Sequence, residues 1–145
     1  MFECLILGDS IAVGLHQVRK ECVAYAKGGI NTWQFNKKFP GEFFSNSVII
    51  SLGSNDHKHI KTRKELEALR KRVLAKDKVI WILPSGNLKA SGVDIKDINS
   101  IIMEIANANG DMVVAPNPQH MSKDGIHPTG KGYRWLEFFT KGQTR

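Results

Sequence analysis

The sequence predicts an α/β domain of three layers, in which a mostly parallel five-stranded sheet lies between two layers of helices. Short apolar runs alternate along the chain with segments whose apolar residues recur at helical spacing. The runs at 48–50 and 79–83 are continuously apolar, as expected of parallel strands that are buried on both faces. The chain has 145 residues, of which 41% are hydrophobic. This is enough for one domain with a substantial core, which we place over residues 1–145.

The apolar runs give the expected strands in chain order. The expected strands are Phe2–Leu7, Cys22–Ala26, Ser47–Leu52, Lys78–Leu83 and Met112–Ala115. Each run is bounded by polar, Gly or Pro residues, which favour turns and helix starts.

Helices are expected in four segments outside these runs, where a capping residue precedes apolar residues at helical spacing. The expected N-terminal caps are Asp9 or Ser10, Thr62, Asp94 and Thr129. Glu65 follows Thr62 at the spacing of a capping box, and Gly110 is expected to end the third helix. The expected inward faces are Ile11, Leu15 and Val18; Leu66, Leu69 and Val73; Ile95, Ile98, Ile102 and Ile105; and Tyr133, Leu136 and Phe139.

The N-terminal sequence and the lengths of the apolar runs predict a cytoplasmic protein, in which cysteines are expected to be reduced. Residues 1–7 lack the basic region of a signal peptide, and no apolar run approaches the ~20 residues needed to span a bilayer. Cys4 and Cys22 are the only cysteines, and we expect them to be reduced core residues. No metal site, cofactor or membrane partner is expected. The sequence leaves open the oligomeric state and whether the gene is carried by a phage.

The chain is basic, with 21 Lys and Arg residues against 14 Asp and Glu residues and a net charge of +7. Nine of the basic residues and only three acidic ones lie between His57 and Lys78. Such a segment can attract nucleic acid, but it contains no aromatic residue on which a base could stack. We therefore interpret it as a solvated amphipathic helix and expect no nucleic-acid partner.

Small and polar residues follow the expected strands where each strand ends. Gly8-Asp9-Ser10 follows the first strand, Gly28-Gly29 the second and Gly53-Ser54-Asn55-Asp56 the third. Asp124-Gly125-Ile126-His127-Pro128 lies beyond the fifth. The carboxyl ends of parallel strands meet at one edge of a sheet, so we expect these four blocks to converge there.

The converging residues include the types that nucleophilic hydrolysis requires. A serine hydroxyl needs a base, the base needs a carboxylate to orient it, and the developing oxyanion needs hydrogen-bond donors. Ser10, His127 and Asp124 are the candidates for the hydroxyl, the base and the carboxylate. The spacing between Asp124 and His127 lets the carboxylate bond one ring nitrogen while the other faces Ser10. Backbone N–H groups at Ser10 and Gly29 and the Asn55 amide are the candidate oxyanion donors. Taken singly, these residues also fit helix caps and turns.

These blocks make the chain resemble the SGNH, or GDSL-type, hydrolases. The matches are Gly8-Asp9-Ser10-Ile11 with Ile for Leu, Gly29 with Thr32, Gly53-Ser54-Asn55-Asp56, and Asp124-Gly125-Ile126-His127-Pro128. The resemblance covers residues 2 to about 139 and implies a flavodoxin-like α/β/α fold. It also implies roles: Ser10 as nucleophile and oxyanion donor, Gly29 and Asn55 as further donors, His127 as base and Asp124 as its partner.

By this resemblance we expect a serine esterase that hydrolyses small-molecule or glycan carboxylic esters. A chain of this length leaves little for the loops that build substrate pockets, so we expect an open site and short acyl groups such as acetyl. The alternative is a non-catalytic module, on a decayed fold of this type, that binds a glycan or a protein; the intact set of blocks argues against it. Nucleotide binding is disfavoured because Asp9 would repel a phosphate. Asp56, His57 and His59 are interpreted as turn or surface residues near this edge.

Overall fold

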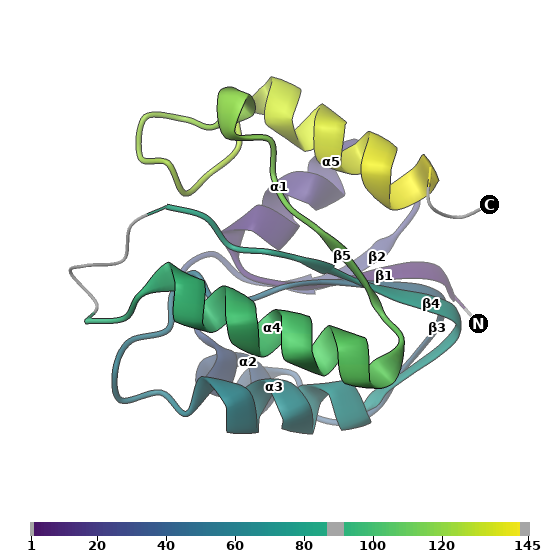
Figure 1. Cartoon of the computed structure of the whole chain (residues 1–145). Helices are drawn as coiled ribbons and strands as arrows, with labels where there is room; N and C mark the ends of the chain where they lie inside the picture. The colour runs from purple at the N-terminus through teal and green to yellow at the C-terminus, as the bar shows by residue number, and fades with distance from the viewer. Residues whose placement is uncertain (1, 87–91, 143–145) are drawn as a thin grey trace.

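The computed structural model describes residues 2–86 and 92–142 and shows a single five-stranded sheet (Figure 1). Its strands are β1 (Phe2–Gly8), β2 (Val23–Ala26), β3 (Phe43–Ser51), β4 (Val73–Ile82) and β5 (Met112–Val114). The spatial order is β2-β1-β3-β4-β5, and every neighbouring pair is parallel. This is the flavodoxin-like order, so the expected fold class is confirmed.

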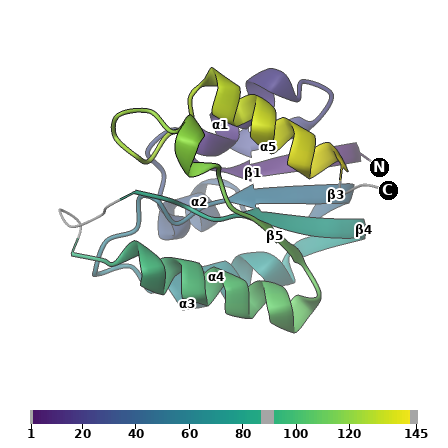
Figure 2. The same ribbon diagram turned by 45° about the horizontal axis from the view of Figure 1, so that its top comes forward.

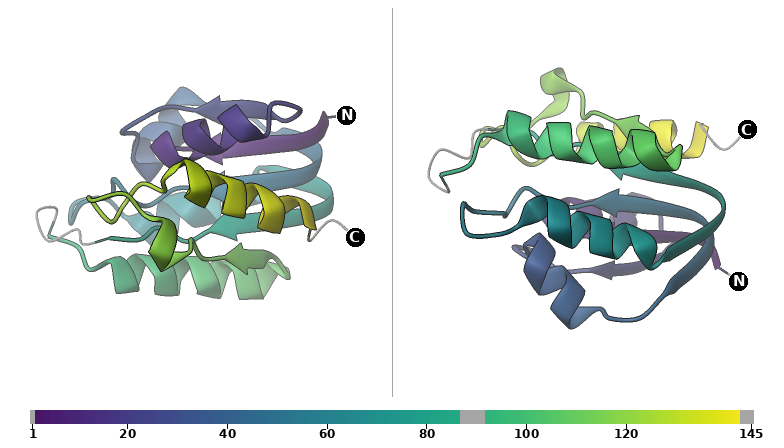
Figure 3. Two further views of the ribbon diagram at one scale, coloured as in Figure 1. Left: turned by 90° about the horizontal axis from the view of Figure 1, so that it is seen from above. Right: turned by 60° about the horizontal axis from the view of Figure 1, so that its bottom comes forward.

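Helices cover both faces of the sheet (Figures 1 and 2). On one face lie α1 (Ser10–Val18) and α5 (Gly130–Gly142), whose Leu15 and Leu136 pack against Ile6 and Ile49. The other face carries α2 (Thr32–Lys38), α3 (Thr62–Lys71) and α4 (Ile95–Asn109), as the two views of Figure 3 show. A short 3₁₀ helix, η2 (Pro118–His120), lies between β5 and α5. Among the described residues, no helix is long and apolar enough to cross a membrane.

Most helix boundaries follow the expected caps. The Asp9 and Asp94 carboxylates accept hydrogen bonds from the backbone N–H groups of Ile11 and Lys96, at the starts of α1 and α4. Gly110 ends α4 in the left-handed conformation with φ of 70°. The Thr129 hydroxyl accepts from Gly132 N at the start of α5. The sequence could predict these helix ends because each cap involves residues that are close together in the chain.

Three local expectations on the α2 and α3 side of the molecule are wrong. No helix was expected at α2, because only Thr32 and Phe35 are buried there and the apolar pattern is weak, although Asn31 and Gln34 form a capping box. The capping box expected at Thr62 does not form, because the Thr62 hydroxyl donates to Asp56 instead. Val73 begins β4 rather than lining the inner face of α3.

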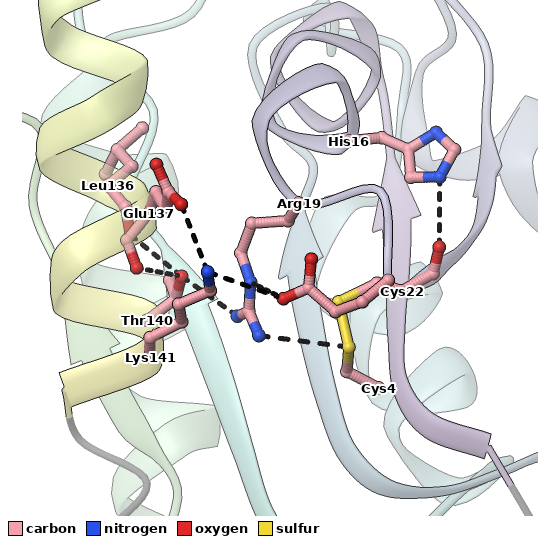
Figure 4. A network of polar contacts seen from close by, with 9 residues as sticks. Cys4, His16, Arg19, Cys22, Leu136, Glu137, Thr140 and Lys141 are labelled. Atoms are coloured by element: carbon pink, nitrogen blue, oxygen red, sulfur yellow. Dashed lines mark hydrogen bonds and ion pairs between the residues drawn. A yellow bond between two sulfur atoms is a disulfide. The ribbon is translucent and has the colours of Figure 1, made fainter.

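The expectation of reduced cysteines is also wrong, because Cys4 and Cys22 form a disulfide (Figure 4). The parallel pairing of β1 with β2 sets Leu5 opposite Val23, which brings the two preceding Cα atoms to 4.7 Å. That distance lies within the range that a disulfide requires. Strand register depends on tertiary packing, so the sequence alone did not reveal this pair.

The side chain of Arg19 lies beside the disulfide, at the edge of the sheet where the strands begin, and makes several polar contacts there (Figure 4). Its guanidinium is buried and donates to Glu21 and to the Thr140 hydroxyl of α5, and it lies 3.9 Å from Cys4 Sγ. The network therefore ties the end of α1 to α5 on the side of the molecule away from Ser10.

Candidate active site

Ser10 stands at the turn from β1 into α1, at the edge of the sheet where the strands end. Gly8 closes β1 against β3, and a Cβ atom at this position would lie only 1.9 Å from the carbonyl oxygen of Ser51. Asp9 N donates to the same carbonyl at 3.0 Å. Only glycine permits this close approach, which fixes the direction in which the chain enters α1 and presents Ser10.

The structure brings Ser10, His127 and Asp124 into one chain of hydrogen bonds. Ser10 Oγ lies 2.8 Å from His127 Nε2, across a separation of 117 residues. On the other side of the ring, His127 Nδ1 lies 2.6 Å from Asp124 Oδ2. The arrangement suits proton transfer from the hydroxyl to the imidazole, with the carboxylate orienting the ring.

A tight loop holds His127 and Asp124 in place. Met121 and Pro128 form an antiparallel bridge at its base, and Ser122 N donates to the carbonyl of His127. Asp124 Oδ1 accepts from the backbone N–H groups of Ile126 and His127 and from the Ser122 hydroxyl. Hydrogen bonds hold the pKa of Asp124 well below its usual range, and the bond with the His127 side chain has the largest effect. The carboxylate therefore stays ionised beside the imidazole.

The segment after β4 supports this loop from the other side. The Ser85 hydroxyl donates to the carbonyl of Gly125 at 3.1 Å. Gly86 packs so closely that a Cβ atom there would lie 2.5 Å from the side chain of Ile126. The backbone around the His127 loop is therefore fixed on both sides.

The two other candidate oxyanion donors lie on adjacent, connected loops. Gly29 has φ of +79°, which favours glycine, and a Cβ atom built on it would meet nothing within 4 Å. The neighbouring Gly28 lies close to Ser10, since its Cβ atom would be 3.9 Å from Ser10 Cβ. Asn55 Nδ2 donates to the carbonyl of Ile30 at 3.0 Å, which leaves one amide hydrogen for another acceptor. The space beside Gly29 is therefore open to a ligand atom.

Asp56 is more than the turn or surface residue that was expected, because it joins three elements near this edge. Its carboxylate is fully buried and accepts from Thr32 N at 2.9 Å, Thr32 Oγ1 at 2.8 Å and Thr62 Oγ1 at 2.7 Å. It thereby fastens the first turns of α2 and α3 to the loop that carries Asn55. The signal was absent from the sequence because the three residues meet only in the tertiary structure.

Asp9 is the second fully buried carboxylate at this edge. Oδ1 accepts from Ile11 N, while Oδ2 has no hydrogen-bond partner among the described residues. Burial raises the pKa of Asp9 from 3.8 to about 7, against the opposing effects of the backbone hydrogen bonds and of His127. Burial, followed by the charges of Asp9 and Asp124, also raises the pKa of Tyr133.

In the described ranges, one group of three side chains could hold a metal ion. It comprises Cys4, Glu21 and Cys22, at the opposite edge of the sheet from Ser10. The two sulfur atoms are bonded to each other, and Glu21 is paired with Arg19. Disulfide sulfurs are not the thiolates that metal ions require, so this group does not fit a metal in the observed state.

The solved structures that share this fold include GDSL-type lipolytic proteins. No family model and no curated protein matches the chain. A GDSL-like lipase from Bacteroides thetaiotaomicron has 18% identity and a TM-score of 0.72, over 99% of this chain and 87% of its own. The catalytic domain of the Streptococcus pneumoniae peptidoglycan O-acetyltransferase A has 15% identity and a TM-score of 0.70, covering 98% and 91%. A carbohydrate acetylesterase family member from Sinorhizobium meliloti has 13% identity and a TM-score of 0.58, covering 97% and 99%.

These matches place the chain among flavodoxin-like α/β proteins and, within that class, give it the fold of GDSL-type hydrolases. The resemblance drawn from the sequence is confirmed at the level of fold. The chain spans at least 86% of each of these structures.

Proposed function

We propose that this protein is a serine ester hydrolase with Ser10 as nucleophile. The observation that carries the proposal is the continuous contact from Ser10 Oγ through the imidazole of His127 to Asp124. The fold shared with lipases, acylhydrolases and an arylesterase supports the same class of activity. A decayed binding module would have no need to keep this geometry.

In the proposed reaction, Ser10 Oγ attacks the ester carbonyl carbon while His127 Nε2 takes the hydroxyl proton. The ionised Asp124 stabilises the resulting imidazolium through Nδ1. The N–H groups of Ser10 and Gly29 and the Asn55 amide would receive the oxyanion. The alcohol leaves with the proton from His127, and water, activated by the same imidazole, releases the acid from the acyl-enzyme.

We further propose that the acyl group is short. A hollow of about 380 Å³ beside the candidate oxyanion donors is lined by Lys27, Gly28, Gly29, Ile30, Gln34 and Lys38. Its lining is mostly polar or small, and Ile30 is the one large apolar residue. A long acyl chain would gain little from such a surface, because its binding free energy depends on the apolar area removed from water.

The test is hydrolysis of p-nitrophenyl acetate by wild type, Ser10→Ala and a matched control, Ser47→Ala. Ser47 lies in β3 opposite Cys4 of β1, toward the edge of the sheet where the strands begin and away from Ser10. Ser10→Ala should lower kcat by on the order of 10⁴-fold, and Ser47→Ala should keep the wild-type rate. A Ser10→Ala variant within tenfold of wild type would overturn the nucleophile assignment. No turnover of any ester by the wild type would favour the binding module.

A further inference from the structure

A second hollow is lined by another part of α2 than the one beside Gly29. It measures about 350 Å³ and is lined by Trp33, His59, Ile60, Lys61, Lys64 and Glu65. The residues come from the first turn of α2, from the loop after β3 and from α3. We call the linings of the two hollows together the α2 surface.

The α2 surface is strongly cationic. Lys27 and Lys38 line the first hollow, and Lys61 and Lys64 line the second. No ion pair joins any of the four to a carboxylate within the described parts of the chain. The single acidic residue, Glu65, accepts a hydrogen bond from Asn36 Nδ2. Cations without a carboxylate partner around two open hollows create a field that attracts anionic ligands.

The fold also supplies the aromatic residue that the basic 57–78 segment lacks. Trp33 is 49% exposed and lines the same hollow as Lys61 and Lys64, although it lies in a different helix. The ammonium group of Lys37 lies 5.6 Å from the centre of its ring. A half-exposed indole beside cations offers a flat apolar face for stacking together with charge recognition.

The α2 surface is physically joined to the candidate active site. Gly29 belongs to both, and Asn55 is hydrogen-bonded to Ile30 in the lining of the first hollow. The buried Asp56 fixes the turns that bear Trp33 and Lys61, because it binds both Thr32 and Thr62. A ligand lying across α2 would therefore be held at a defined position relative to Ser10.

We propose that the α2 surface binds an anionic polysaccharide and presents an acylated hydroxyl of that polymer to Ser10. The inference rests on the proposed function. A polymer fits because two separate hollows are lined by residues of α2, and sugar hydroxyls are groups that carry carboxylic esters. The mostly polar lining disfavours a lipid chain, and Trp33 suits the apolar face of a sugar ring.

The binding test uses Ser10→Ala protein, which holds an ester without turning it over. The probes are dextran and carboxymethyl-dextran, acetylated to the same degree, so that only the carboxylates differ. Carboxymethyl-dextran should bind at least about tenfold more tightly at low salt, and added salt should reduce the difference because it screens exposed charges. Trp33→Ala should weaken the binding of both polymers.

Charge-reversal variants locate the surface. Lys61→Glu/Lys64→Glu should lower the affinity for carboxymethyl-dextran by about tenfold or more. The matched control, Lys20→Glu/Lys76→Glu, changes the net charge equally. Lys76 lies near Cys4 and Arg19, and Lys20 follows α1, away from the α2 surface, so the control should bind as the parent does. In the catalytically intact background, Lys61→Glu/Lys64→Glu should lower the ratio of kcat/KM for acetylated carboxymethyl-dextran to that for p-nitrophenyl acetate. Thermal melts by circular dichroism establish that each variant is folded.

Three results would overturn the proposal: equal affinity for the two dextrans, an equal loss of affinity in the control variant, or tighter binding to an oligothymidylate than to carboxymethyl-dextran. The last would assign the α2 surface to single-stranded nucleic acid. Binding is measured without turnover, so these failures are distinct from failure of the proposed function, which would appear as wild type inactive on every ester.

Discussion

Replacing Asp9 with Asn is expected to change how the stability of the protein depends on pH. Asp9 is fully buried and caps α1 through Ile11 N. An Asn side chain keeps the size and an acceptor for that N–H group, since Asn caps helices as well as Asp does. It removes the ability to ionise and replaces Oδ2, which has no hydrogen-bond partner among the described residues, with an amide NH₂ group.

The magnitude follows from the pKa of Asp9, which burial raises from 3.8 to about 7. Between these values the folded protein keeps the Asp9 proton while the unfolded chain has lost it. The free energy of unfolding therefore falls as pH rises, by up to about 1.4 kcal/mol per pH unit from this group. Across the whole interval the loss is on the order of 4 kcal/mol, and it is complete above about pH 7. Asp9→Asn abolishes this loss.

Urea unfolding of both proteins at about pH 5 and about pH 8 measures the effect. The difference in the free energy of unfolding between the two pH values should be smaller in Asp9→Asn than in wild type by about 2–3 kcal/mol, because the assay spans about two pH units of the interval below pH 7. Asp94→Asn is the matched control, because Asp94 caps α4 in the same way but is exposed. Identical pH profiles for Asp9→Asn and wild type would refute the reasoning.

Four further predictions test other parts of the structure. Asn55→Ala should lower kcat by ~10²–10³ with little change in KM, because the amide is needed when charge develops on the carbonyl oxygen; an effect on KM alone in steady-state kinetics would mark a ground-state contact. Asp56→Ala leaves two buried hydroxyls without their acceptor, so urea unfolding should show a loss of about 3 kcal/mol, and an unchanged midpoint would contradict the bracing role. Reduction of the bond between Cys4 and Cys22, which are 18 residues apart, should lower the free energy of unfolding by about 3 kcal/mol; equal stability with and without dithiothreitol would count against a structural disulfide. Acetyl esters should be hydrolysed at least as efficiently as octanoyl esters, and a steady rise in kcat/KM toward octanoyl would show a deep apolar acyl site, since each buried methylene contributes ~0.8 kcal/mol.

Local patterns in the sequence were sufficient for much of the fold. Continuous apolar runs such as 48–50 located buried strands, and the caps at Asp9, Asp94 and Gly110 located helix ends. The convergence of Ser10 with His127 followed from one general property, that parallel strands end at the same edge. Each of these inferences needs only neighbouring residues or the direction of the strands.

Features that depend on register or on contacts between helices could not be predicted. The Cys4–Cys22 disulfide requires the pairing of β1 with β2, and the Asp56 brace requires α2 and α3 to begin side by side. Trp33 joins the basic residues only because α2 packs beside α3. The composition of the 57–78 segment therefore gave an incomplete description of its surface.

Labelling with a fluorophosphonate tests the central claim most directly, because the reagent bonds covalently to a serine that is activated as a nucleophile. Peptide mapping by mass spectrometry identifies the modified residue. The proposed geometry predicts a single adduct at Ser10 in the wild type, with labelling strongly reduced in His127→Ala because the hydroxyl has lost its base. An unlabelled Ser10, or equal labelling of Ser10 in wild type and His127→Ala, would contradict it.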